Sequence, residues 1–372
     1  MSTAGRRLSV VSALMVLSGL LGACSGSSAV EAPDSNDATS TTVVAPAIST
    51  TTTTEKVYAA DAFDRTDSLL GERVRSAGLS GGMVKIGRVD GTVIHEQSMG
   101  AVDGSTPLSV ASSTKWLTAA TFMTLVDDGI ASLDDPVSKW LPYWATSETV
   151  RQLLTHTSGV RDNSCQGGGG SLDACVRAIA GSPRQFAPGA QFSYGNSSFL
   201  VVGRVIEMAG GADFATVVHD RLTGPLAMAA TTWPGSPGGA NPAFGVRVTV
   251  DDYGRFLTMI LRRGEFDGVR VLSEGSIDEL VSEQTRSYDT SRDFSVGITK
   301  IPRYGLGCWP DVVNTFSATT VVSGNGGMGL YPWVDFSTNT WGIVGVQDER
   351  GAQLAVPASQ KVEVEARLAA AR

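Results

Sequence analysis

Hydrophobic and polar positions divide the chain into three parts. Residues 8–21 form a short apolar run, residues 25–56 are rich in Ser, Thr, Ala and Pro, and regularly spaced apolar positions begin only near residue 60. A segment with few apolar residues cannot bury enough surface to offset its chain entropy. The pattern therefore predicts a leader at residues 1–23, a disordered stalk at 24–58 and a folded domain at 59–372.

The spacing of apolar residues predicts several elements within the folded part. Asp90-Gly91 lies between two alternating segments, which is a strong signal for a β-hairpin. The segment before Gly129 lacks Pro and Gly and is expected to be helical, with Gly129 closing it. We expect helices over 61–77, 112–128 and 357–371 and strands over 83–89, 93–99 and 340–346. Strands at both ends and a helical middle predict an α/β (α+β) fold, with one sheet and an inserted helical lobe.

The first residues have the pattern of an export signal. Arg6 and Arg7 precede the apolar run, which is too short to span a bilayer as a stable helix. Leu21-Gly22-Ala23-Cys24 resembles a bacterial lipobox, in which the cysteine becomes the lipidated first residue of the mature protein. An ordinary secretory signal with an incidental cysteine is the alternative. Both readings place the mature protein outside the cytoplasm, and the first predicts lipid anchoring to the cell membrane through Cys24.

Composition excludes several classes of function. The chain has 372 residues, with 29 basic and 37 acidic side chains and a net charge of −8, which argues against nucleic-acid binding. The 3 histidines are far apart and the 4 cysteines form no C-x-x-C pair, so we expect no metal site. Gly167–Gly170 lacks the Lys and Ser/Thr of a phosphate-binding loop, and no cofactor is expected.

Cys165 and Cys175 flank this glycine-rich segment. In an oxidising compartment, two nearby cysteines in a loop predict a disulfide, although two buried free thiols are the alternative. Cys308 would then be single and buried.

Two short motifs carry candidate chemistry. In Ser112-Ser113-Thr114-Lys115, the serine and lysine are three residues apart and would share one face of a helix. A serine hydroxyl becomes a nucleophile when a base takes its proton, and burial can keep a lysine neutral enough to do so. A capping serine with a surface lysine is the alternative. In Tyr194-Gly195-Asn196, a phenol and an amide two residues apart could reach one cleft.

Together with the surrounding sequence, these motifs resemble the serine β-lactamase and penicillin-binding superfamily, in its class C β-lactamase-related branch. The resemblance covers nearly all of residues 60–370 and rests on the following segments: Ala111–Lys115, Leu133–Val137 ahead of Leu141-Pro142, Leu153–Gly159, Pro188-Gly189 before Phe192–Ser197, and Tyr304–Gly307.

The resemblance implies an antiparallel sheet flanked by the N- and C-terminal helices, an all-helical lobe, and an active site between them. It implies that Ser112 is the acylated nucleophile, that Lys115 and Tyr194 move protons, and that Asn196 binds substrate. Which of the lysine and the tyrosine is the base stays open, because coupled groups share a proton. His156 suggests a Ser-His-Asp triad, but with a lysine available it is expected to be a structural residue that bonds the backbone.

A third family motif differs here. Family members usually place Lys or His on the strand that lines the cleft, and the equivalent position is predicted to be Asn325, within Ser323–Gly329. Without that cation the site lacks a partner for a substrate carboxylate. We therefore expect a serine hydrolase that acts on an ester, amide or β-lactam, with esterase or peptidase-like activity favoured over efficient β-lactamase activity. The alternative is an inactive descendant that binds cell-wall peptides or a protein partner.

Overall fold

The computed structural model describes residues 56–162, 171–234, 240–291 and 293–372. The predicted signal peptide and Cys24, nearly all of the predicted stalk, and Cys165 with Gly167–Gly170 lie outside these residues. Residues Val57–Arg372 form one compact unit, which is the subject of everything below. Within the described residues, no helix is both long enough and apolar enough to cross a bilayer.

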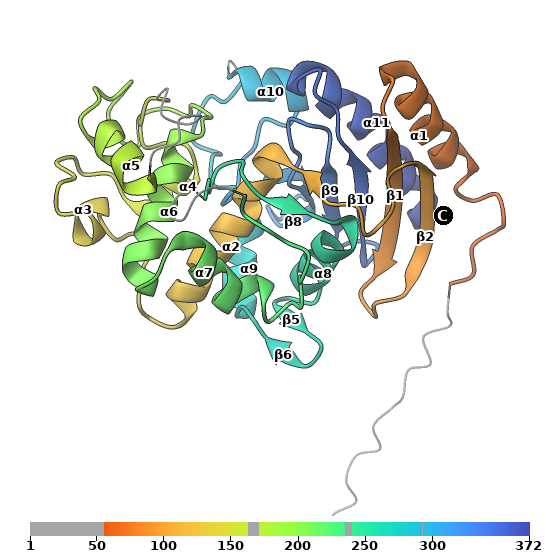
Figure 1. Ribbon diagram of the computed structural model, residues 1–372, viewed down its shortest axis with the longest axis horizontal. Helices are drawn as coiled ribbons and strands as arrows, with labels where there is room; N and C mark the ends of the chain where they lie inside the picture. The colour runs from red at the N-terminus through yellow and green to blue at the C-terminus, as the bar shows by residue number, and fades with distance from the viewer. Residues whose placement is uncertain (1–55, 163–170, 235–239, 292) are drawn as a thin grey trace, which may run out of the picture. The chain divides into compact units, whose positions relative to one another are not determined.

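A six-stranded sheet joins the two ends of this unit (Figure 1). The strand order is β2-β1-β10-β9-β8-β7, and each strand is antiparallel to its neighbours. The bounds are β1 Gly81–Arg88, β2 Val93–Gly100, β7 Trp309–Val313, β8 Thr319–Ser323, β9 Tyr331–Asp335 and β10 Thr340–Val346. The N-terminal hairpin pairs with the C-terminal strand, with Met83 opposite Gly345 and Val84 opposite Val344. The predicted α/β fold class with one sheet from both chain ends is confirmed.

Helices cover both faces of the sheet. The terminal helices α1 (Asp64–Ala77) and α11 (Ala352–Ala371) pack together on one face, and α8 (Val250–Leu261) packs against β1, β9 and β10. Because side chains alternate across a strand, Val84 and Val344 join the core under α1 and α11, while Met83 and Ile343 join the core on the other face. Burial on both faces explains why β10 is a continuous apolar run rather than an alternating one.

The helical lobe lies between residues 137 and 299. Its helices are α3 Val137–Trp140, α4 Val150–Leu154, α5 Leu172–Ala180, α6 Ser197–Gly210, α7 Phe214–Val218, η3 His219–Thr223, α9 Glu274–Val281 and α10 Phe294–Thr299. Two small sheets pair β3 (Leu108–Ser109) with β4 (Arg247–Val248) and β5 (Glu265–Phe266) with β6 (Val269–Arg270). Side-chain oxygens cap the first turns of several helices, as Ser171, Asp213 and Asp293 do for α5, α7 and α10.

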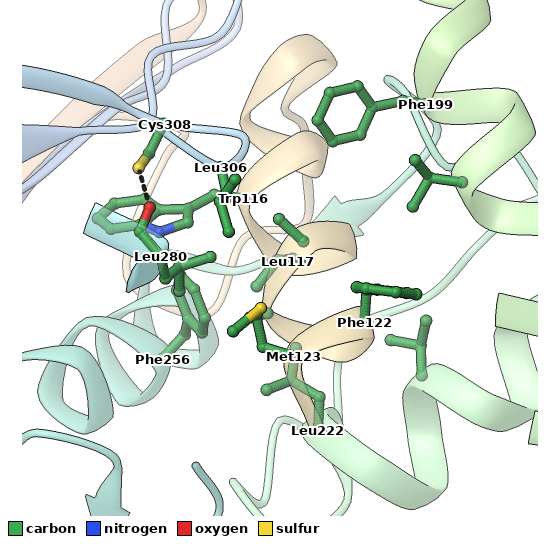
Figure 2. Packing of buried hydrophobic residues seen from close by; sticks show 14 of the residues in the cluster. Trp116, Leu117, Phe122, Met123, Phe199, Leu222, Phe256, Leu280, Leu306 and Cys308 are labelled. Atoms are coloured by element: carbon green, nitrogen blue, oxygen red, sulfur yellow. Dashed lines mark hydrogen bonds between the residues drawn. The ribbon is translucent and has the colours of Figure 1, made fainter. Parts of the chain in front are cut away.

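The central helix α2 (Thr114–Asp127) is buried on all sides and follows the short turn η1 (Ala111–Ser113). Every residue from Thr114 to Leu125 is buried, which explains why the helix has no polar face. Figure 2 shows Trp116 packed with Phe256 and Leu280 on one side of α2, while Phe199 and Phe122 lie on the other. This packing fixes the start of α2, where Ser112 and Lys115 lie.

Two predicted boundaries were wrong. The C-terminal helix was expected to begin at Pro357 but begins at Ala352, so the proline lies inside α11. The α-helix predicted to begin at Ser112 begins at Thr114, because Ser112 and Ser113 lie in the separate 3₁₀ turn η1.

Candidate active site

Ser112 and Lys115 meet at the start of the central helix. Ser112 lies in η1 and Lys115 is the second residue of α2, so one helical turn separates them. The Lys115 Nζ atom donates a hydrogen bond to the Ser112 Oγ atom over 3.1 Å. The alternative of a surface lysine is wrong, because Lys115 has no exposed surface.

Lys115 has two further partners, both from the segment between residues 137 and 299. Its Nζ atom donates to the Asn196 Oδ1 atom over 2.7 Å and to the backbone oxygen of Ala243 over 3.0 Å. Burial disfavours the ammonium form and lowers the pKa of Lys115 to about 7, although the carboxylate of Asp162 opposes this shift. A substantial fraction of Lys115 is therefore a neutral amine near neutral pH.

Tyr194 reaches the same serine from the loop before α6. Its side chain shares a hydrogen bond with Ser112, and its ring lies 5.0 Å from the Lys115 Nζ atom. The ring also stacks on Trp309, with centroids 5.6 Å apart. Burial raises the pKa of Tyr194 well above its ordinary value, so the phenol keeps its proton near neutral pH.

Asn196 is the residue before the first turn of α6, and its amide oxygen faces Lys115. The structure thus brings Ser112, Lys115, Tyr194 and Asn196 into one cluster, although Lys115 and Asn196 are 81 residues apart in sequence.

Asn325 lies in the connection between β8 and β9 and borders the same cavity as Ser112 and Tyr194. Its side chain is 6% exposed, and its Nδ2 atom has no hydrogen-bond partner. The neighbouring Gly326 is required by close packing, because a Cβ atom there would overlap the backbone oxygen of Val110. The strand connection therefore lies directly against the turn that carries Ser112, and it presents an unsatisfied amide donor.

The cavity beside Ser112 is small and mostly apolar. Its volume is about 60 Å³, and helices α10 and α11 supply much of its wall. The lining residues are Ser112, Tyr194, Phe294, Ser295, Ile298, Thr299, Trp309, Asn325, Gly327, Ala352 and Val356. None of these side chains carries a formal charge at neutral pH.

His156 supports the tyrosine loop. Its ring centroid is 4.5 Å from that of Tyr194, its Nε2 atom lies 3.3 Å from the Tyr304 hydroxyl, and its backbone oxygen accepts the N–H of Ser193. Burial and the charge of Lys115 lower the pKa of His156 well below its ordinary value. The ring bonds a phenol rather than the backbone that was expected, because Tyr304 packs beside it in the same aromatic cluster.

The cysteine predictions differ in outcome. Cys308 is a buried free thiol, as expected, and its Sγ atom donates to the backbone oxygen of Leu280 (Figure 2). Cys175 lies in α5, whereas Cys165 is outside the described residues, so their disulfide stays a prediction. The described residues contain no group of three or more His, Cys, Asp or Glu side chains that could hold a metal ion.

Three contributors to the site escaped the sequence reasoning. The Ala243 contact is a backbone oxygen, which leaves no signature in the sequence. Asp162 and Asp293 hold the backbone on the two sides of Gly195, with Asp293 Oδ2 accepting the Tyr194 N–H over 3.0 Å. An acidic residue three positions after the Leu153–Gly159 segment was the available signal for Asp162.

Comparison with known proteins identifies the family. Residues 67–363 match the sequence profile of the Beta-lactamase family. The chain belongs to this family. It is a serine hydrolase of the β-lactamase and penicillin-binding type, as the resemblance carried by its combined motifs implied.

Individual relatives agree with this assignment. Protein Rv1367c of Mycobacterium tuberculosis is 27% identical over 312 residues, covering 64% of this chain and 76% of that protein. Esterase EstB of Burkholderia gladioli is 30% identical over 202 residues, covering 46% of this chain and 51% of EstB. A candidate beta-lactamase from Bacteroides dorei DSM 17855 has a crystal structure that superposes with a TM-score of 0.73 at 26% identity, covering 83% of this chain and 99% of that one.

Proposed function

We propose that this protein is an extracytoplasmic, lipid-anchored serine esterase that cleaves uncharged esters through an acyl-enzyme on Ser112. The observation that carries the substrate preference is the lining of the cavity beside Ser112, which contains apolar, hydroxyl and amide groups but no charged side chain. A substrate carboxylate would enter this apolar space without an ionic partner, which is costly. An ester of an uncharged acid and alcohol incurs no such cost.

Lys115 is the better candidate for the base. Its pKa of about 7 leaves a neutral amine available, whereas the raised pKa of Tyr194 disfavours the phenolate. As Lys115 takes the hydroxyl proton, the Ser112 Oγ atom forms a bond to the ester carbonyl carbon. The ester C–O bond then breaks, and the departing alkoxide receives a proton through Tyr194. Water attacks the acyl-enzyme, releases the carboxylic acid and regenerates the Ser112 hydroxyl.

Other elements of the site support this sequence of steps. In this proposal the backbone N–H of Ser112 stabilises the oxyanion, because Ser112 belongs to the first turn of the helical segment that begins with η1. The amide of Asn325 offers an uncharged donor to the substrate, at the position where the family resemblance predicts a cation in other members. The esterase name of the Burkholderia relative agrees with the preference, although the aligned part spans about half of that enzyme.

The test is a hydrolysis screen of the full chain in detergent. Nitrophenyl acetate and butyrate are compared with a chromogenic cephalosporin and a D-Ala-D-Ala peptide, and the Ser112→Ala variant is run beside the wild type. Ester turnover that disappears in Ser112→Ala, with a fluorophosphonate adduct on Ser112 by mass spectrometry, supports the proposal. Faster turnover of the cephalosporin or the peptide would contradict the substrate preference. Absence of any turnover and any adduct would favour the inactive peptide- or protein-binding alternative.

The cellular location rests on the sequence pattern of residues 1–24. Export followed by lipidation of Cys24 predicts that the chain incorporates labelled palmitate and fractionates with membranes. The Cys24→Ala variant should lose the label. A wild-type chain that is exported but never labelled would indicate the ordinary secretory signal instead.

A further inference from the structure

Asp162 holds the backbone of the Tyr194-Gly195-Asn196 turn. Its Oδ1 atom accepts hydrogen bonds from the backbone N–H of Asn196 over 2.8 Å and from that of Ser197 over 2.9 Å. These N–H groups begin α6, where the first turn has no carbonyl partners within the helix. A carboxylate at this end of a helix also interacts favourably with the helix dipole. The carboxylate thus fixes the point from which Asn196 reaches Lys115.

The position of the Asp162 carboxylate also explains why residue 195 is a glycine. A Cβ atom at Gly195 would lie 2.5 Å from the Asp162 Oδ1 atom, so the carboxylate would have to move away from its hydrogen bonds to Asn196 and Ser197. The glycine between the tyrosine and the asparagine therefore makes room for the carboxylate.

Asp162 also acts on the proton-transfer groups through its charge. It raises the pKa of Lys115 against the effect of burial, and it raises that of Tyr194. The other titratable groups that face this pair are His156, Asp293 and Tyr304. Because the pKa of His156 is well below its ordinary value, its neutral ring adds no charge change above neutral pH.

We propose that Asp162 is a positioning residue for the hydrolytic reaction, which holds the Tyr194–Asn196 turn against Lys115 and supplies the negative charge that faces the lysine. The proposal rests on the proposed function, in which Ser112, Lys115 and Tyr194 perform the chemistry. Two effects follow that can be separated, one from the hydrogen bonds and one from the charge.

Two variants separate these effects. Asp162→Asn keeps an acceptor oxygen and removes the charge, so kcat should stay within about tenfold of wild type. In a plot of kcat/KM against pH, the acidic limb of this variant should move to lower pH. The reason is that the Asp162 carboxylate, which favours the protonated form of Lys115, is no longer charged. Asp162→Ala removes the acceptor as well, so kcat should fall about 10–100-fold with KM little changed. The profiles are measured at low ionic strength because Asp162 is exposed.

Asp213 provides a matched control. It is also a carboxylate at the start of a helix, as the N-cap residue of α7 whose side chain accepts the Thr216 N–H over 3.2 Å, and it does not border the cavity. Asp213→Asn and Asp213→Ala should lower the melting temperature without moving the pH profile. If the Asp162 variants behave like the Asp213 variants, Asp162 is a structural cap and the positioning role is wrong.

The design also distinguishes failure of the proposed function. If the wild type turns over no ester, the proposed function fails, and the pH dependence of unfolding still measures the charge effect on Lys115. The unfolding free energy rises with pH where Lys115 is neutral in the folded protein and charged in the unfolded chain. In Asp162→Asn this rise should begin at a lower pH than in the wild type. An unshifted profile would overturn the electrostatic part of the proposal.

Discussion

The Nζ atom of Lys115 lies 3.1 Å from the Oγ atom of Ser112, and its two other partners are carbonyl oxygens. A neutral amine has two N–H donors and one lone pair. The oxygens of Asn196 and Ala243 can only accept, so in the neutral form of Lys115 they take both donors, and the lone pair then faces Ser112 in place of the third donor and can accept its hydroxyl proton. The partner set therefore fits the deprotonated amine that a base requires.

The first prediction concerns the pH dependence of acylation. Because Lys115 has a pKa of about 7, acylation of Ser112 should rise with pH up to about 7, level off above it, and fall about tenfold per unit below it. Stopped-flow measurement of fluorophosphonate labelling between pH 5 and 9 tests this. Lys115→Arg should lose about 10²–10⁴-fold at every pH, because a guanidinium stays charged. A flat wild-type profile over this range would exclude Lys115 as the base.

The second prediction concerns stability. Between about pH 7 and 10.5 the folded protein keeps Lys115 neutral while the unfolded chain binds a proton there. Raising the pH through this window removes that proton from the unfolded chain and so favours folding. Relative to Lys115→Met, the unfolding free energy of the wild type should rise by about 1.4 kcal/mol per pH unit.

Urea unfolding of the two proteins at pH 7, 8 and 9 measures this difference. Subtracting the unfolding free energy of Lys115→Met at each pH removes the contribution of the other titrating groups. The lost Lys115 hydrogen bonds add only a constant difference that does not depend on pH. A difference that does not change with pH would mean that Lys115 is charged in the folded protein.

The sequence predicted the local parts of the site better than the long-range ones. Ser112 and Lys115 are one helical turn apart, so helix geometry alone could place them together. That Asn196 meets them followed only from the family resemblance, because no local rule relates residues 81 positions apart. The Ala243 contact could not be predicted, since any residue offers a backbone oxygen.

The strands of the sheet show the same difference between local features, which could be predicted, and long-range ones, which could not. The hairpin of β1 and β2 was readable from Asp90-Gly91, whereas β7, β8 and β9 were not predicted as separate strands. The short β8 carries two threonines at its start and a serine at its end, and β9 is buried throughout. Neither has the clear alternation that marks a half-buried strand. Their position next to β10 decides their structure, and that position is a tertiary property.

The third prediction concerns substrate charge at Asn325. Because this amide borders the cavity, at the position where the family resemblance predicts a cation in other members, Asn325→Lys should raise kcat/KM for a carboxylate-bearing cephalosporin about tenfold relative to nitrophenyl butyrate. Asn325→Gln, which stays neutral, is the control and should leave the ratio unchanged. Steady-state kinetics on both substrates give the ratio. An equal change in the two variants would show that side-chain size, and not charge, sets the preference.

The fourth prediction concerns the contact between the β8–β9 connection and the turn that carries Ser112. A Cβ atom at Gly326 would overlap the backbone oxygen of Val110, and backbone cannot move aside as a flexible side chain can. Gly326→Ala should therefore lower the unfolding free energy by about 1–3 kcal/mol and slow labelling of Ser112, because it pushes the turn out of place.

Gly327→Ala is the matched control for this contact. Its added Cβ atom would meet the Ala352 Cβ atom at 3.4 Å, which is an ordinary contact, so its melting temperature should stay close to that of the wild type. Calorimetry and labelling kinetics on both variants measure the two effects separately. If Gly326→Ala keeps the wild-type melting temperature and labelling rate, the turn carrying Ser112 is not held by this contact. The position of Ser112 would then depend on the packing of α2 alone.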